Sequence, residues 1–217
     1  MLINSPSPRK HKYHTYGGCW LHYNKAQHQS FIYVHIPKCA STYGLLAMQN
    51  YWTWNYITET TDYGMNGLLR KQILDSAKIY FSILRDPIER WISGIVQCRV
   101  RELTNKTWQD IFTQVVFDNH TEPQVSFLDQ LDTEKVNWFY CDNDLSTNLN
   151  NWTDQYGCLN RINHKALNVI NKKSITQQNI RKELIQQINK NPIYEQKLLE
   201  FFSEDYKLIN SVKFYGH

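Results

Sequence analysis

Two stretches of the chain combine a basic residue with hydroxyl groups at the end of an apolar run. The first is FIYVHIPKCASTY, residues 31–43, in which the apolar run breaks at Pro37 and presents Lys38. Ser41 and Thr42 then open a predicted helix. Backbone N–H groups at a helix start lack partners within the helix and carry partial positive charge. These amides, the hydroxyls and the lysine together predict a site for a phosphate or a sulfate group.

The second stretch repeats this strand-to-helix arrangement. In FSILRDPIERWISG, residues 81–94, Arg85 ends an apolar run and Ser93 follows eight positions later on the next predicted helix. An arginine and a hydroxyl at this spacing are suited to hold a second anionic group. The two stretches together predict a ligand that carries two separated anionic groups.

The paired motifs resemble those of the sulfotransferases that use 3'-phosphoadenosine 5'-phosphosulfate (PAPS), in particular the branch with Golgi-type carbohydrate sulfotransferases. In that family a loop like residues 35–42 binds the 5'-phosphosulfate, and an arginine and serine like Arg85 and Ser93 bind the 3'-phosphate. Residues 119–124, NHTEPQ, look like the branch's H-x-x-P-Q element, and residues 203–209, SEDYKLI, look like its closing helix. The resemblance covers most of the chain.

The resemblance implies a reaction and its co-substrate. The protein would move a sulfuryl group from PAPS to an acceptor hydroxyl by direct in-line transfer without a metal, leaving adenosine 3',5'-bisphosphate. Such enzymes mainly align the reactants and stabilise charge on the oxygens, and Lys38 would assist the leaving oxygen. The residues expected around the donor are Lys38, Cys39, Ala40, Ser41, Thr42, Tyr43, Arg85 and Ser93.

The general base for the acceptor hydroxyl stays open between two residues. In related enzymes a glutamate or a histidine between the two motifs often has this role. Glu59 lies 21 positions after Lys38, and Asp62 is a neighbour that could substitute for it. His120 is the other candidate, because its ordinary pKa of about 6.5 suits proton transfer near neutral pH. We rank Glu59 slightly above His120, although Glu59 could equally be a surface charge and His120 a helix-end residue.

Other side chains narrow the chemistry less. The five cysteines are odd in number and form no C-x-x-C pair, so we expect free thiols, no metal site, and a packing role for Cys39. Aromatic rings pack against sugar C–H surfaces, which weakly favours a glycan over a small-molecule acceptor such as a phenol or a lipid alcohol. The rings in question belong to Tyr43, Tyr51, Trp52, Trp54, Tyr56 and Tyr63.

The elements that position these residues can be read from the apolar pattern. Near-continuous apolar runs predict buried strands at 31–36, 79–84 and 136–140. They indicate an α/β fold, and with the resemblance a P-loop-NTPase-like three-layer fold with a central, mainly parallel sheet flanked by helices. Helices are predicted at 42–51, 67–77, 87–103, 176–189 and 193–210, with a helical region at 108–131 broken at Pro123 and a long loop at 143–163.

The predicted helix 87–103 has two faces. An apolar stripe would pack on the core, and on the other, polar face Ser93 could point toward a ligand held by Arg85, with a merely solvated stripe as the equal alternative. That polar face consists of Asp86, Arg90, Ser93 and Gln97.

Composition sets the outer limits. A chain of 217 residues suits one domain, expected at 13–217 after a loose segment at 1–12. The net charge of +4 is mild and scattered, so we expect no nucleic-acid partner. No apolar run reaches the roughly 18 residues of a membrane span. We therefore expect a soluble, cytoplasmic protein, in an oligomeric state that the sequence does not indicate. Golgi-type relatives carry a membrane anchor, so the sequence is either trimmed or of bacterial or viral origin, and we favour the second.

Two other functions are compatible with parts of this pattern. A P-loop kinase or NTPase shares the strand, loop and helix, but its usual G-x-x-x-x-G-K-[ST] sequence is missing here. A non-catalytic module would bind the nucleotide without transferring its sulfuryl group.

Overall fold

The computed structural model describes nine segments of the chain. They are residues 19–24, 29–41, 43–44, 55–60, 79–101 with 103, 105–128, 131–156 and 174–216. At 19–24, 29–31 and 55–60 the description covers the backbone. The predicted loose segment 1–12, the predicted helix 67–77, most of the predicted helix 42–51, and Thr42 and Asp62 lie outside the described residues.

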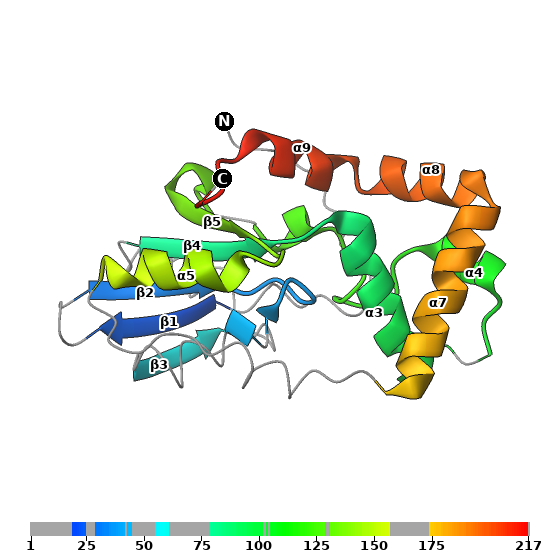
Figure 1. The fold of residues 1–217 in the computed structure, drawn as a ribbon, viewed down its shortest axis with the longest axis horizontal. Helices are drawn as coiled ribbons and strands as arrows, with labels where there is room; N and C mark the ends of the chain where they lie inside the picture. The colour runs from blue at the N-terminus through cyan, green and yellow to red at the C-terminus, as the bar shows by residue number, and fades with distance from the viewer. Residues whose placement is uncertain are drawn as a thin grey trace.

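A five-stranded mixed sheet forms the centre of an α/β fold (Figure 1). Its strand order is β3-β1-β2-β4-β5. The last three strands run parallel, whereas β1 is antiparallel to both of its neighbours. The strands are β1 (Cys19–Asn24), β2 (Gln29–Val34), β3 (Asn55–Thr60), β4 (Ile79–Leu84) and β5 (Val136–Tyr140).

The three predicted strands are confirmed as the parallel part of the sheet. The predicted bounds agree with β4 and β5, and β2 begins and ends two residues earlier than expected. Ile32, Val34 and Phe81 are fully buried, as strands covered on both faces require. The antiparallel strands β1 and β3 were not predicted from the sequence.

One face of the sheet is covered by α5 (Leu145–Asp154), where the sequence pattern predicted a loop. That prediction is wrong because asparagine and threonine hide an apolar stripe. Leu145, Leu149 and Trp152 recur at helical spacing and are buried. The ring of Trp152 lies 5.0 Å from that of Phe81 and 5.5 Å from that of Phe139. The aromatic core around β4 and β5 therefore depends on this helix.

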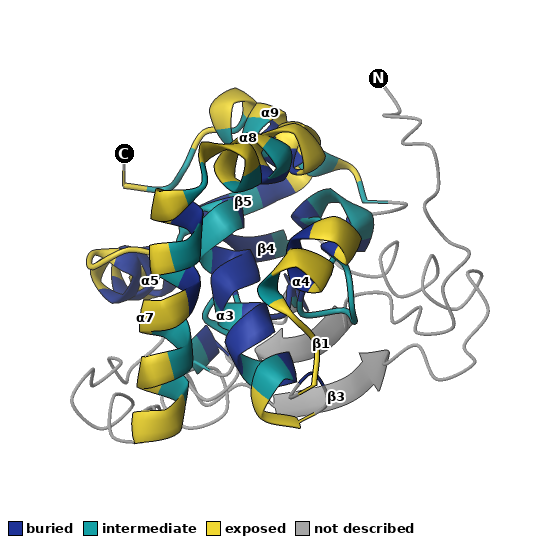
Figure 2. Ribbon diagram, turned by 90° about the vertical axis from the view of Figure 1, so that its right-hand side faces the viewer, coloured by how far each residue is buried: buried dark blue, intermediate teal, exposed yellow. Residues whose placement is uncertain are grey.

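The helix α3 (Pro87–Arg101) begins where the sequence predicted a helix. Proline occupies its first turn, and the Asp86 carboxylate caps it by accepting the Glu89 N–H at 2.8 Å. Figure 2 shows α3 largely buried beside α7 (Ile175–Lys190) and α4 (Trp108–Gln114), whose outer faces are exposed. Trp91, Phe112 and Leu184 belong to an apolar cluster that joins these helices and is separate from the core around the sheet.

The remaining helical predictions hold in part. The predicted helix 176–189 is confirmed by α7, but the predicted helix 193–210 divides into α8 (Pro192–Phe201) and α9 (Ser203–Ser211). The division falls at Phe202, which is fully buried and has left the helical conformation. The region predicted helical at 108–131 is α4, a turn, and the short 3-10 helix η1 (Gln124–Phe127). A second 3-10 helix, η2 (Thr133–Lys135), precedes β5.

No helix in the described segments is long and apolar enough to cross a membrane.

Candidate functional site

The two predicted anion-binding corners are neighbours in the structure. The parallel strands β2 and β4 pair in register from Phe31–Ile79 to Val34–Ser82, so their carboxyl ends meet at one edge of the sheet. Lys38 follows the first strand and Arg85 the second. The Arg85 guanidinium donates from Nη1 to the Lys38 carbonyl oxygen at 3.3 Å. The corners therefore touch, as a single ligand held by both would require.

The loop after β2 makes a tight turn that presents Lys38. The Cys39 N–H donates to the Ile36 carbonyl at 3.2 Å, with Pro37 at the second turn position and Lys38, φ 67°, at the third. This is the residue pattern of a type II turn. Ala40 is also left-handed, with φ 52°. Backbone N–H groups in loops with left-handed residues can form a concave site for an anion.

Cys39 is fully buried beneath that loop. Its thiol donates to the Gln124 side-chain oxygen at 3.0 Å, and burial raises the pKa of Cys39 to about 12. A thiol in this state is not a nucleophile at neutral pH. Its surroundings give Cys39 a packing role in the loop.

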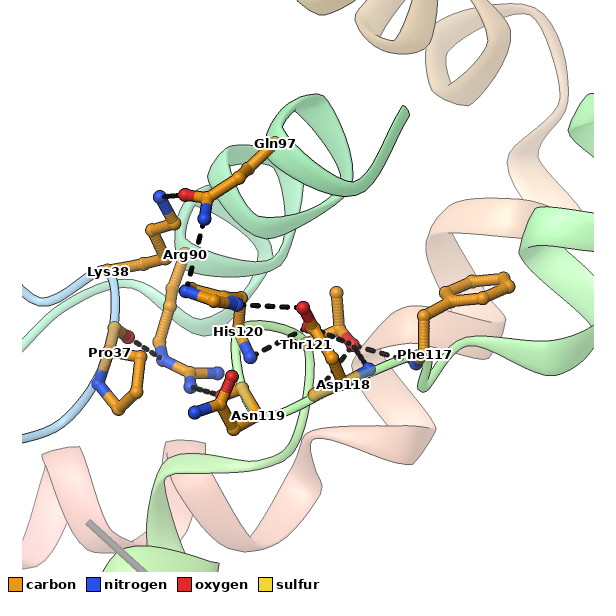
Figure 3. Close-up of polar contacts among 9 residues, drawn as sticks. All are labelled: Pro37, Lys38, Arg90, Gln97, Phe117, Asp118, Asn119, His120 and Thr121. Atoms are coloured by element: carbon orange, nitrogen blue, oxygen red, sulfur yellow. Dashed lines mark hydrogen bonds and ion pairs between the residues drawn. The ribbon is translucent and has the colours of Figure 1, made fainter. Parts of the chain in front are cut away.

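The sequence pattern placed Arg90 on the polar face of α3, but its side chain is fully buried and bonds three backbone carbonyls in the interior. Figure 3 shows two of these contacts, with Pro37 and Asn119. Nε donates to the Pro37 oxygen at 2.8 Å, Nη2 to the Asn119 oxygen at 3.1 Å, and Nη1 to the Glu122 oxygen. The Phe127 ring packs on the guanidinium with 5.4 Å to its centroid. Arg90 thus ties the Lys38 loop to residues 119–122.

Two side chains far away in sequence hold the Arg85 corner. The Gln124 amide accepts from the Arg85 N–H at 3.0 Å and donates to the Arg85 carbonyl at 2.8 Å. The buried Asp205 carboxylate accepts from the N–H groups of Gln124 and Val125 at 2.8 and 2.9 Å. Burial raises the pKa of Asp205, although these hydrogen bonds oppose the rise. The segments 119–124 and 203–209 therefore support the site from behind.

His120 lies beside the Lys38 loop and forms a pair with Asp118. Its Nδ1 is 2.8 Å from Asp118 Oδ2, and its backbone N–H donates to Asp118 Oδ1 at 2.9 Å. Burial tends to raise the pKa of Asp118, but the hydrogen bonds from His120 outweigh it and the pKa falls below its usual value. The His120 side chain keeps a quarter of its surface exposed. Its ring can therefore be reached by a bound molecule.

The side chain of Gln97 connects His120 to Lys38. Gln97 on α3 has its Nε2 3.3 Å from His120 Nε2, and its Oε1 accepts from Lys38 Nζ (Figure 3). Gly94, one turn earlier, allows this closeness, because a Cβ there would collide with the His120 carbonyl oxygen. The structure thus brings together Lys38, Gln97, His120 and Asp118, of which the sequence singled out Lys38 and His120 as catalytic candidates.

Glu59 lies on a different part of the sheet. It belongs to β3, where its Cα pairs with that of Trp20, and not to a loop. β3 is separated from β2 by β1, which places it about 10 Å from β2 at the usual strand spacing. His120 is connected to Lys38 through Gln97, whereas the description of Glu59 covers its backbone alone.

Glu89, in the first turn of α3, is paired with two arginines. Glu89 Oε2 accepts from Arg85 Nη2 at 3.3 Å and from Arg181 Nη2 of α7 at 2.5 Å. Ser93, partly buried, follows Glu89 by one helical turn. The buried Arg181 Nη1 has no hydrogen-bond partner among the residues that the structure describes. Two guanidinium groups thus meet the single carboxylate of Glu89, one helical turn before Ser93.

Lys38 forms no ion pair with a carboxylate in the described segments, and burial lowers the pKa of its ammonium group.

Within the same segments no three histidine, cysteine, aspartate or glutamate side chains gather as a metal site would require. Ser41 and Tyr43 are partly buried at the helix start behind the loop, with Gly44 N–H donating to the Ala40 carbonyl at 2.9 Å.

The fold and these contacts define an α/β protein with two joined basic corners at the carboxyl edge of a sheet. Comparisons with protein-family models, with curated proteins and with solved structures return no match.

The partly buried His35, which precedes the loop, predicts a pH-dependent stability. Burial lowers the pKa of His35 to about 4, and repulsion by His120 and Arg90 adds to this. The unfolded chain, with a histidine pKa of about 6.5, binds more protons between these values, so stability is full above pH 6.5 and falls toward pH 4. The loss amounts to at most about 3 kcal/mol. Urea unfolding at pH 7.5 and 5 measures it.

His35→Gln is the control for this titration. The variant should lose clearly less stability than the wild type between the two pH values, since glutamine does not titrate. Equal losses in the two proteins would show that His35 is not held neutral in the fold.

Proposed function

We propose that this protein is a PAPS-dependent sulfotransferase that transfers a sulfuryl group directly to an acceptor hydroxyl, with a carbohydrate as the favoured acceptor. The observation that carries the proposal is the contact between the two basic corners, in which Arg85 Nη1 meets the Lys38 carbonyl at 3.3 Å. A nucleotide with phosphate groups on both sides of its ribose matches two joined anion sites. The motifs that resemble this family lie at those same corners.

On the donor side, each corner would bind one anionic group. The 5'-phosphosulfate would lie against the loop amides, with Lys38 near the oxygen that leaves with the nucleotide. The 3'-phosphate would lie between Arg85 and Ser93. Glu89 lies between Arg85 and Ser93 in the sequence, and its carboxylate would repel a phosphate. The Arg181 guanidinium offsets that negative charge, with Nη2 2.5 Å from Glu89 Oε2. In this account Arg181 makes the second corner suitable for an anion.

On the acceptor side, His120 is the proposed base. Asp118 holds Nδ1 at 2.8 Å, which leaves Nε2 as the nitrogen that can accept a proton. The acceptor proton moves to Nε2, the acceptor oxygen bonds to sulfur, and the bond from sulfur to the phosphate oxygen breaks. The Lys38 ammonium stabilises the charge left on that oxygen.

The finer fold assignment is part of the same proposal. We infer a P-loop-NTPase-like arrangement, supported by a loop and helix start after β2 and by the parallel order β2-β4-β5. The magnesium ligands and glycines of an NTPase loop are not needed for a metal-free donor site, and the loop at 35–42 has no glycine.

A transfer screen tests the function directly. Purified protein is mixed with sulfur-labelled PAPS and panels of glycans, phenols and peptides, and the label is followed to the acceptor. We expect labelled glycan and, in parallel, adenosine 3',5'-bisphosphate. Tight binding of that bisphosphate with no labelled acceptor in any panel would instead support the non-catalytic module. Hydrolysis of ATP with magnesium and no response to PAPS would support the NTPase.

Arg85→Ala should weaken donor binding more than it slows turnover. The side chain is proposed to contact the 3'-phosphate and not the reacting atoms, so we expect at least about a tenfold loss in affinity for adenosine 3',5'-bisphosphate. Isothermal titration measures the affinity, and kcat at saturating PAPS measures turnover. Lys182→Ala, at an exposed position on α7, is the control and should bind like wild type. An unchanged affinity in Arg85→Ala would remove Arg85 from the donor site.

A further inference from the structure

The amide of Gln97 lies between a hydrogen-bond donor, Lys38, and a ring nitrogen of His120. On one side its Oε1 accepts from Lys38 Nζ, and on the other its Nε2 lies 3.3 Å from His120 Nε2 (Figure 3). Gln97 is partly buried on the face of α3 that also carries Ser93. No role in binding or catalysis follows from the sequence motifs for this residue.

The chemistry of the partners sets the orientation of this amide. A lysine ammonium has only donors, so the amide must offer its oxygen to Lys38. Its NH₂ group then points to His120 Nε2 and can donate to it only if that nitrogen carries a lone pair. The proton of a neutral imidazole must therefore lie on Nδ1, where Asp118 Oδ2 accepts it at 2.8 Å. Lys38, Gln97 and Asp118 together select one tautomer of His120.

The Gln97 amide cannot form a hydrogen bond with a protonated His120 while it accepts one from Lys38. An imidazolium has N–H groups at both nitrogens, so Nε2–H would face the NH₂ group of Gln97. If the amide turned to offer its oxygen to His120, its NH₂ group would face the Lys38 ammonium. The contact between Lys38 and Gln97 and a proton on His120 Nε2 are thus mutually exclusive.

We propose that Gln97 is a positioning residue that couples the acceptor base to the donor lysine. At rest its amide fixes His120 with a bare Nε2 and keeps Lys38 away from the donor. An acceptor hydroxyl that reaches Nε2 takes the place of the amide, and the displaced Gln97 releases Lys38. This inference rests on the proposed function for its substrates, but the coupling itself belongs to the protein without ligand.

The coupling orders the transfer step. The acceptor proton goes to His120 Nε2, the acceptor oxygen forms its bond to sulfur, and the bond from sulfur to the nucleotide's phosphate oxygen breaks. The electron pair stays on that oxygen, where the released Lys38 stabilises it. Without an acceptor, Lys38 stays with Gln97, so water is a poor substitute as the nucleophile.

Nitrogen NMR of histidine in the protein without ligand tests the coupling. We expect the Nδ1–H tautomer of His120 in the wild type. Gln97→Glu, which places a carboxylate at Nε2, should favour a proton on that nitrogen. Gln97→Met keeps the length without the amide and should weaken the preference for the Nδ1–H tautomer. Val100→Ala, at an exposed position on the same helix, is the control and should leave the His120 nitrogen signals unchanged.

Two results would overturn the coupling. One is an Nε2–H tautomer in the folded wild type, and the other is an Nε2 that stays without a proton in folded Gln97→Glu. A second measurement follows release of sulfate from labelled PAPS without acceptor, which should rise several-fold in Gln97→Met relative to the wild type. If the wild type does not bind PAPS at all, the proposed function fails, whereas the NMR result still decides the coupling.

Discussion

Lys38→Met is expected to lower kcat for sulfuryl transfer by about a hundredfold to a thousandfold, while adenosine 3',5'-bisphosphate still binds. Methionine preserves the length of the side chain but removes the positive charge. That charge acts mainly when the bond to the leaving oxygen breaks, since at rest Lys38 donates to Gln97. The loss should therefore appear in kcat at saturating PAPS and much less in donor affinity.

Lys38→Arg separates charge from shape in this experiment. Arginine keeps the charge on a bulkier, planar group, so turnover should recover in part. The thermal midpoint of both variants must stay near that of the wild type, because the turn at Lys38 has a left-handed backbone that methionine and arginine adopt no more easily than lysine. Wild-type kcat in folded Lys38→Met would remove Lys38 from the reaction.

Arg90→Leu is expected to destabilise the fold by about 3 kcal/mol or more, because three buried carbonyls lose their donor. Those carbonyls belong to Pro37, Asn119 and Glu122, so the loss falls on the two segments that carry Lys38 and His120. Urea unfolding followed by tryptophan fluorescence measures the change. Arg90→Lys should recover little of the stability, since one ammonium cannot span three carbonyls in the directions of a guanidinium.

Arg99→Leu provides the matched control on the same helix. Arg99 also donates to backbone carbonyls, those of Leu103 and Lys106, but it is less buried and stacks on Trp108. Its loss should cost less than half as much as that of Arg90. Equal costs for the two variants, or a cost below about 1 kcal/mol for Arg90→Leu, would show that Arg90 does not hold these segments together.

The parallel part of the fold could be predicted from sequence because its strands are nearly all apolar. The start of α3 was equally clear from Pro87, whose effect on the backbone is local. The helix α5 was missed because its stripe of Leu145, Leu149 and Trp152 lies among asparagines that usually indicate loops. Propensity failed there because burial of the stripe in the core outweighs it.

The candidate site could be predicted only where strand order sufficed. Parallel strands place Lys38 and Arg85 at one edge, and this follows from the pattern alone. The support from Gln124 and Asp205 joins residues 39 and 81 positions apart, and no local signal announces such contacts. Helical spacing placed Arg90 with Ser93 and Gln97, but it could not reveal that the guanidinium bonds carbonyls in the interior.

The central claim is that one nucleotide with two anionic groups occupies both corners at once. Isothermal titration without magnesium tests it most directly, with adenosine 3',5'-bisphosphate compared with adenosine 5'-monophosphate and with ATP. We expect the bisphosphate to bind one per chain and at least about tenfold more tightly than the monophosphate, because the monophosphate leaves the Arg85 corner empty. Equal binding of bisphosphate and monophosphate, or binding that requires ATP and magnesium, would contradict the claim.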